Sequence, residues 1–323
     1  MSPNLQGALF ALLAFGIYAT HDVVVKFLGA DYHAIQIIFF AGLLSFPLVT
    51  LMLMNDGTEG HLRPVHPWWT ALRTVCTVIT GVTAFYAFSV LELAETYAIL
   101  FATPLLITVL AIPLLGERVG PRRGIAVGVG LLGVLIVLRP DAGGLSLGHL
   151  AALAAAVCSS LASIIVRKIG PDERSVVLLL YPMVANFAVL GCALPFVYKP
   201  MPIEHLGMLG IIAACSFVAT LLVIGAYRRA EAVVVAPMQY SQMIWAIFYG
   251  YLIFNETPDQ WTLIGAGVII ASGIYIVLRE DKGAVSENQP VLATRSRPET
   301  GLMPRISLLL RRGAGRSAPR DEG

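Results

Sequence analysis

The chain has 323 residues, of which 57% are hydrophobic and only 13% are charged. Because about a quarter of the residues in an average soluble domain are charged, this composition excludes an ordinary soluble fold and indicates that a lipid bilayer is the solvent. The formal net charge of +2 is too small to indicate a nucleic-acid partner, and none is expected.

Ten apolar segments are each long enough to cross a bilayer, which takes about 20 helical residues. In chain order they are 5–27, 34–54, 68–90, 96–115, 121–138, 147–166, 175–197, 206–227, 232–254 and 260–278. Lipid offers no partner to exposed backbone groups, so these segments are predicted to be helices and not open strands. We therefore expect an all-α membrane protein with ten transmembrane helices.

The distribution of basic residues predicts how the segments are oriented. All but three of the 22 Lys and Arg residues fall on the side of the N-terminus, in loops, at helix ends (Arg73 among them) and in the C-terminal segment. The exceptions are Lys26, Arg139 and Lys199. Cytoplasmic loops carry an excess of Lys and Arg, so both termini are predicted to be cytoplasmic, in a multi-pass protein of the cell inner membrane. The first segment has no basic leader and is read as a retained span, not a signal peptide.

The chain repeats itself at an offset of 139 positions. Glu117 falls on Glu256 and Gly128 on Gly267, within similar apolar surroundings. The loop around Glu117 carries three arginines, whereas its counterpart NETPDQW carries none. With five segments in each copy, the second copy must run through the membrane in the opposite direction, as in the inverted repeats of secondary transporters. The predicted units are a five-helix repeat over 1–140, a second over 141–280, and a disordered basic cytoplasmic tail over 281–323.

Short signatures of ATP hydrolysis and of metal binding are absent from the sequence. It contains no GxxxxGK[ST] or HExxH motif, and its four cysteines lie in apolar segments without CxxC spacing. No catalytic residue, metal or cofactor is therefore predicted. A membrane-embedded enzyme that would use His21 and Asp22 is kept only as a distant alternative.

His21 and Asp22 lie in the first segment, at a depth where charge is costly. Asp22 comes 17 residues after Leu5, or about 26 Å along a helix, which places it near the outer face. One interpretation is an i,i+4 pair between Asp22 and Lys26 at the helix end. The other assigns His21 and Asp22 to gating or proton coupling, for which the near-neutral titration of histidine is suited.

Aromatic and amide side chains also lie at crossing depth. A cavity lined by such groups would bind a planar or amphipathic organic molecule by stacking and hydrogen bonding. For the two glutamines, hydrogen bonds between helices are an equal alternative. The predicted substrate contacts are Tyr18, Tyr86, Gln239, Gln242 and Trp245, with Asn186 and Tyr240 in the same class.

Prolines and glutamates mark the segments that correspond in the two copies. Pro104 and Pro237 fall in the fourth and ninth segments and are expected to interrupt both helices, which points to a site at the membrane midplane. Glu117 and Glu256 follow these segments and are assigned to turn structure. Glu95 is expected near the start of the fourth helix, where its charge favours the helix dipole.

Three stretches resemble the drug/metabolite transporter superfamily of EamA type: HDVVVKFLG (21–29), ATPLLITVLAIPLLGERV (102–119) and FNETPDQWTLIGAGVII (254–270). The resemblance covers about residues 5–280 and implies two EamA units, ten helices and a central cavity shared between them. The first and last stretches are similar to the branch that takes up S-adenosylmethionine, and riboflavin importers are close competitors. Many relatives carry an arginine where this chain has Ala41, which leaves the cationic contact to an anionic substrate without its usual residue.

These observations predict a secondary transporter that takes up a small organic metabolite by alternating access. The expected partners are a small-molecule substrate and the lipid bilayer, and a homodimer is left open. An exporter of amino acids, metabolites or drugs would share every feature above and is the main alternative.

Overall fold

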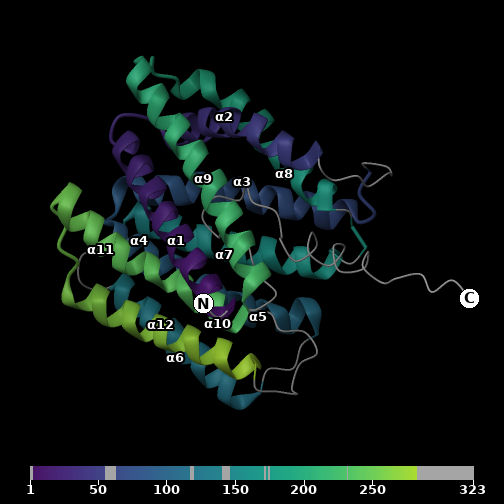
Figure 1. Cartoon of the computed structure of the whole chain (residues 1–323), viewed down its shortest axis with the longest axis vertical. Coiled ribbons are helices and arrows are strands. Elements are labelled where there is room, and N and C mark those ends of the chain that lie inside the picture. The colour runs from purple at the N-terminus through teal and green to yellow at the C-terminus, as the bar shows by residue number, and fades with distance from the viewer. Residues whose placement is uncertain are drawn as a thin grey trace, which may run out of the picture.

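The computed structural model describes residues 3–54, 63–116, 120–139, 146–170, 172–173, 175–230 and 232–281, and throughout these ranges the regular structure is helical (Figure 1). The predicted tail from residue 282 onward, Glu117 and Glu231 lie outside the described residues. In the first half of the chain the helices are α1 (Pro3–Gly29), α2 (Ala34–Met54), α3 (Pro67–Val90), α4 (Leu93–Leu100), α5 (Thr103–Leu115) and α6 (Pro121–Leu138).

The second half follows the same order. Its helices are α7 (Leu147–Ile169), α8 (Ser175–Val197), α9 (Ile203–Arg229), α10 (Ala232–Val235), the 3₁₀-helix η1 (Ala236–Tyr240), α11 (Ser241–Phe254) and α12 (Gln260–Asp281). Each predicted segment coincides with one helix, or with a helix interrupted at one place. Among the described residues, six helices are long and apolar enough to cross a membrane, and the apolar parts of α2, α6 and α12 are shorter.

The two predicted interruptions are confirmed. The fourth segment divides into α4 and α5 at Phe101 and Ala102, with Pro104 in the first turn of α5. The ninth divides into α10 and α11 around η1, which contains Pro237. Proline lacks the N–H that an α-helix needs at this point, so the chain changes its hydrogen-bonding pattern there.

The ends of these two segments also match. α5 ends at Gly116 with φ of 69°, and α11 ends at Asn255 with φ of 53°. These are left-handed conformations that commonly end helices, and asparagine is one of the few residues besides glycine that adopts them readily. The same 139-position offset relates the two residues, so the sequence repeat extends to the backbone conformation at this position.

The helices of the two halves interleave. α1 packs along α9, α3 along α7, and α6 along α12, which lies beside it at the bottom of Figure 1. Gly133 and Gly265 allow this last pair to approach closely, since a Cβ on either residue would lie within 3 Å of the other's carbonyl oxygen. The largest buried cluster contains residues of both halves, so the two halves share one core.

Candidate functional site

The first helix carries a buried acid and a buried histidine. His21 Nδ1 lies 2.7 Å from Asp22 Oδ1, and each residue is 1% exposed. The His21 ring also meets the edge of the Phe85 ring of α3, with centroids 6.0 Å apart. A carboxylate at this depth is costly unless donors surround it, and residues of this kind in membrane helices are commonly functional.

Two further side chains connect this pair to the interrupted helices. The Tyr97 hydroxyl, on α4, donates to Asp22 Oδ2, and Gln242 Nε2, on α11, donates to the Tyr97 hydroxyl at 3.4 Å. Tyr97 and Gln242 are 0% and 2% exposed. The four side chains form a buried polar network, which we define as His21, Asp22, Tyr97 and Gln242. It joins α1 to both interrupted segments and therefore bridges the two halves.

The interruptions themselves meet next to this network. Phe101, at the break between α4 and α5, packs edge to face against Tyr240 at the end of η1, with ring centroids 5.1 Å apart. The 139-position offset relates these two residues as well. The Phe101 ring also lies beside the Tyr97 ring, with centroids 5.9 Å apart. The break between α4 and α5 is bridged by backbone hydrogen bonds from Phe101 to Tyr97 and from Ala102 to Ile99, and the second of these spans three residues instead of the four of an α-helix.

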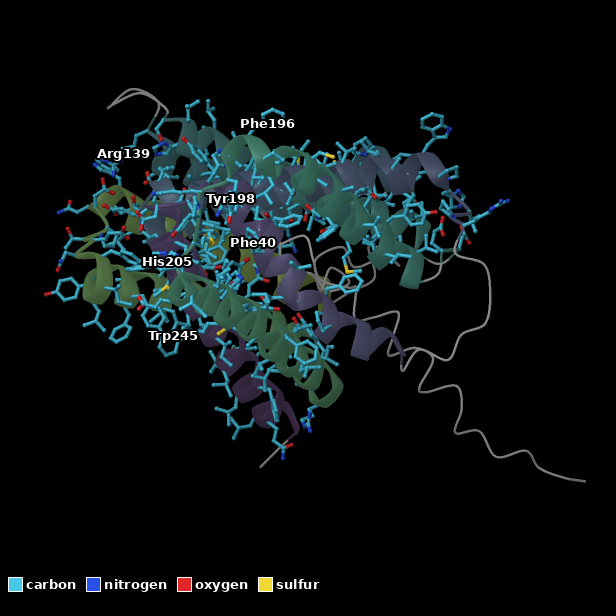
Figure 2. The ribbon with its side chains drawn as sticks, turned by 90° about the horizontal axis from the view of Figure 1, so that it is seen from above. Phe40, Arg139, Phe196, Tyr198, His205 and Trp245 are labelled. Atoms are coloured by element: carbon cyan, nitrogen blue, oxygen red, sulfur yellow. The ribbon has the colours of Figure 1, made fainter. Side chains whose placement is uncertain are left out.

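The other predicted substrate residues lie on four elements, α1, α3, η1 and α11. Tyr18 is buried between α1 and α9, and its hydroxyl lies 3.0 Å from Thr220 Oγ1. Trp245, on α11 and labelled in Figure 2, is 36% exposed and stacks on Tyr249 with centroids 5.9 Å apart. Tyr86 and Gln239 are half-buried on α3 and η1. Of the predicted contacts, the structure thus brings Gln242 together with His21 and Asp22 through Tyr97.

Lys26 forms an ion pair with a residue far away in the sequence. Its Nζ lies 2.5 Å from Glu256 Oε1 and also donates to the carbonyl of Leu91. The other oxygen of Glu256 accepts from the backbone N–H of Leu93 at 3.1 Å. The assignment of Glu256 to turn structure alone is incomplete, because its side chain holds α1 and the α3–α4 connection together. The i,i+4 spacing of Asp22 and Lys26 suggests a pair between them, whereas the hydrogen bonds of Asp22 described above are to His21 and Tyr97.

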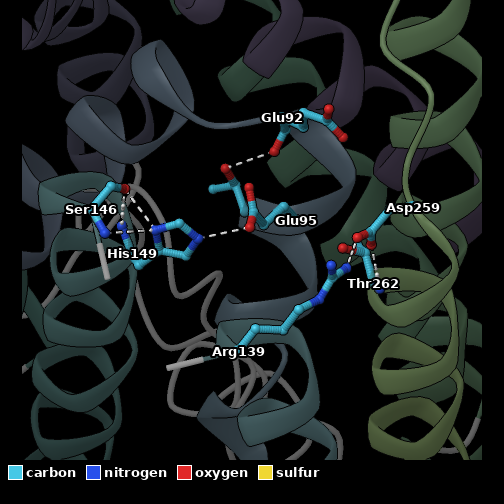
Figure 3. Close-up of polar contacts among 8 residues, drawn as sticks. Glu92, Glu95, Arg139, Ser146, His149, Asp259 and Thr262 are labelled. Carbon is cyan, nitrogen blue, oxygen red and sulfur yellow. Dashed lines mark hydrogen bonds and ion pairs between the residues drawn. The ribbon is translucent and has the colours of Figure 1, made fainter. Parts of the chain in front are cut away.

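Figure 3 shows further carboxylates, Glu92 and Glu95 near the start of α4 and Asp259 just before α12. Glu95 lies in the first turn of α4, as expected, and its Oε1 is 2.7 Å from His149 Nε2. Burial raises the pKa of the Glu92 carboxyl above its ordinary value, and the neighbouring charges of Glu256 and Glu95 raise it further. Arg139, at the end of α6, forms an ion pair with Asp259, just before α12. At this end of the molecule, Lys26–Glu256, Glu95–His149 and Arg139–Asp259 thus connect the two halves.

Comparison with known proteins identifies the family. Residues 5–139 and 146–279 each match the EamA-like transporter family, which is consistent with the repeat and covers most of the chain. The chain belongs to this family. It contains two EamA units, and it is a transmembrane protein of the drug/metabolite transporter superfamily.

Individual relatives carry different names. The chain is 25% identical to an S-adenosylmethionine uptake transporter of Rickettsia prowazekii over 287 residues, which is 88% of this chain and 97% of that protein. It is 24% identical to the pseudopaline exporter CntI of Pseudomonas aeruginosa (86% and 98% covered) and 26% identical to a riboflavin transporter of Vibrio cholerae (86% and 95% covered). These relatives indicate a transporter of small metabolites.

A solved crystal structure matches 87% of this chain and 99% of its own, with a TM-score of 0.51 and 20% sequence identity. At this level of identity the likeness shows the fold alone. It supports the arrangement of helices in the two EamA units and adds nothing about the substrate.

Sequence reasoning missed one member of the network and one partner of the ion pair. Tyr97 is an aromatic residue at crossing depth in an interrupted helix, so the rule that selected Tyr18 and Tyr86 would have selected it too. The Lys26–Glu256 pair left no local signal, because its members are 230 positions apart. Only the packing of the two EamA units brings them together.

Proposed function

We propose that this protein is an inner-membrane secondary transporter that takes up a small organic metabolite, of the S-adenosylmethionine or riboflavin type, by alternating access. The observation that carries the proposal is the buried polar network that connects α1 to the two interrupted helices, one in each EamA unit. The family and the names of its relatives support the transport class.

The packing of the helices supports an inverted arrangement of ten spans with both termini in the cytoplasm. By their order in the two units, α1 corresponds to α7, α3 to α9 and α6 to α12. The extensive α1–α9 contact therefore has a counterpart in the equally extensive α7–α3 contact, and the α6–α12 contact is its own counterpart. The positive-inside distribution of Lys and Arg supports placing both termini in the cytoplasm.

In the proposed mechanism, substrate binds at the interrupted helices, in contact with Gln239, Gln242, Tyr18, Tyr86 and Trp245. Asp22 and His21 couple or gate the movement. Protonation of the Asp22 carboxylate would remove its charge and weaken the hydrogen bond from Tyr97, because charged acceptors bind donors more strongly than neutral ones. The contact between α1 and α4 would then loosen, and the two units could change their relative position.

The test is uptake of labelled S-adenosylmethionine and labelled riboflavin into cells that lack their own route for either compound. We expect one compound to accumulate at least several-fold over a vector control. Asp22→Asn should lower the rate by about tenfold or more and flatten its dependence on pH, since the titrating group is gone. Asp31→Asn, on the connection after α1, is the matched control and should change neither.

If neither compound enters or leaves cells faster than in the vector control, the substrate assignment is wrong. If Asp22→Asn transports with unchanged pH dependence, Asp22 has no coupling role and serves structure only. The two results are independent, so each part of the proposal can fail separately.

Export is the second candidate, and the similarity to a pseudopaline exporter favours it. The geometry of the site is the same for either direction. Inverted membrane vesicles separate the two candidates: an exporter loads the vesicles with labelled compound from the cytoplasmic face, whereas an importer loads right-side-out vesicles.

A further inference from the structure

The helix α8 contains a proline in its interior, at Pro182. In a regular helix the N–H of residue 182 would donate to the carbonyl of Leu178, four positions earlier. Proline has no N–H, so it leaves this carbonyl without its helical donor. In a membrane protein water does not supply a replacement, and neighbouring helices commonly do.

The replacement here comes from the other EamA unit. Arg73, the seventh residue of α3, donates from Nη1 to the carbonyl oxygen of Leu178. Arg73 is 7% exposed, and among the described residues no carboxylate forms an ion pair with it. Its Nε has no hydrogen-bond partner within the described part of the chain. The backbone carbonyl on α8 is therefore the principal acceptor for a buried guanidinium.

From this geometry we infer that Arg73 is a positioning residue that replaces the missing N–H of Pro182 and holds the flexible point of α8 against α3, across the boundary between the two EamA units. A proline inside a helix permits bending at the turn that lacks its hydrogen bond. With Arg73 in place, the bend can occur without leaving the carbonyl unsatisfied. The contact thus couples a bend in the second unit to a helix of the first.

The inference rests on the proposed function only for its transport readout, so the first experiment measures stability. Thermal unfolding of the purified protein in detergent is compared for four forms: wild type, Arg73→Met, Pro182→Ala and the double variant. Arg73→Met should lower Tm by roughly 2–6 °C in the wild-type background, because it leaves a buried carbonyl unsatisfied. In the Pro182→Ala background the same change should cost less than half as much, since the backbone N–H that this substitution restores now donates to the carbonyl of Leu178.

A matched control uses the other interior proline of α8. Pro195 leaves the carbonyl of Gly191 without its helical donor, whereas Arg73 Nη1 donates to the carbonyl of Leu178. In the Pro195→Ala background, Arg73→Met should therefore cost as much as in the wild type. If the cost of Arg73→Met is equal in the Pro182→Ala and wild-type backgrounds, Arg73 does not serve the proline gap and the inference is overturned.

The transport readout then tests the positioning role, with labelled S-adenosylmethionine and labelled riboflavin as the probes. Arg73→Met should lower the maximal rate several-fold at nearly constant KM, and Arg73→Lys, which keeps a charged donor, should recover part of the rate. An alternative is that Arg73 binds an anionic group of the substrate directly. In that case KM would rise for S-adenosylmethionine, which carries a carboxylate, and not for riboflavin, and the rise would persist with Pro182→Ala. That result would overturn the inference.

The two failures remain distinguishable. If wild-type protein transports neither probe, the proposed function fails. The stability comparison still shows whether Arg73 replaces the hydrogen bond that Pro182 cannot donate. If transport is present and the stability cost of Arg73→Met does not depend on residue 182, the inference fails and the proposed function stands.

Discussion

Lys26 and Lys168 end the first helix of the first and second EamA units, and their surroundings differ. Lys26 is 11% exposed, forms an ion pair with Glu256 and donates to the Leu91 carbonyl. Lys168 is exposed, donates to the Leu114 carbonyl at 3.1 Å, and lies over the Trp69 ring at 4.3 Å. The lysines near the ends of these two helices thus differ: Lys26 has an acidic partner shielded from water, and Lys168 has neutral partners in contact with water.

The histidines at the two ends show the same difference. His149 Nε2, at the Lys26 end, is 2.7 Å from Glu95, and the two side chains are 15% and 20% exposed. His66 Nε2, at the Lys168 end, is 3.3 Å from Asp172, and those side chains are 39% and 63% exposed. Among the described residues, the pairs of Lys26 and His149 are thus more shielded from water than the pair of His66 and the contacts of Lys168. In a transporter that alternates, we expect the other state to reverse this difference.

The largest expected effect is at the Lys26 end. Lys26→Glu places two carboxylates together in a site largely removed from water, which should cost about 3–5 kcal/mol of unfolding free energy. Lys168→Glu, at the exposed lysine near the end of α7, should cost about 1 kcal/mol or less. Thermal unfolding in detergent measures both. Adding Glu256→Gln to Lys26→Glu removes the repulsion and keeps an acceptor for the Leu93 N–H, so it should restore part of the loss. No recovery would show that repulsion at this pair is not the cause of the loss.

A smaller difference is expected for the histidines. His149→Ala removes the partner of Glu95 and the side chain that completes the cap of α7 with Ser146, and it should cost about 1–2 kcal/mol. His66→Ala removes an exposed pair and should cost about 0.5 kcal/mol or less. Equal losses in the two variants, measured by thermal unfolding at low ionic strength, would contradict the difference in burial between the ends.

The smallest effect concerns pH. Because the pKa of Glu92 is raised in the folded protein, the folded state holds its proton more tightly than the unfolded chain does. Stability contributed by this proton is present at low pH and is lost as pH rises through the window between the ordinary and the raised pKa. Glu92→Gln should therefore leave Tm unchanged at about pH 4 and raise it at neutral pH. A Tm difference that is constant over pH would show that Glu92 does not titrate in this window.

Hydropathy and proline were sufficient to predict much of the fold. The ten segments match the helix bounds closely, because the length of an apolar run is set by the bilayer and can be read locally. Pro104 and Pro237 correctly marked the two interruptions, since the missing N–H is a property of the residue itself. Arg73 lies near the start of α3, as the predicted segment 68–90 placed it, but its bond to the carbonyl of Leu178 could not be predicted from the sequence.

The candidate site was only partly predictable. His21, Asp22 and Gln242 were selected because polar residues at crossing depth are costly, and the structure joins them through Tyr97. Tyr18 satisfied the same rule, and the structure shows it hydrogen-bonded to Thr220 of α9. The cost of burying a polar group can be inferred from sequence, but the partner that offsets this cost depends on how distant helices pack.

The amino-acid sequence by itself determined the solvent, the helices, their interruptions and the family, because composition, periodicity and motifs are properties of short stretches of chain. Tertiary structure decided that Glu256 pairs with Lys26 and that Tyr97 bonds to Asp22. It also decided that Arg73 of one unit donates to the Leu178 carbonyl of the other. These contacts join residues dozens to hundreds of positions apart. Many charged groups and hydrogen-bond donors in the sequence could pair with one another. The packing of the two units decides which of them come into contact, because each buried polar group needs a partner.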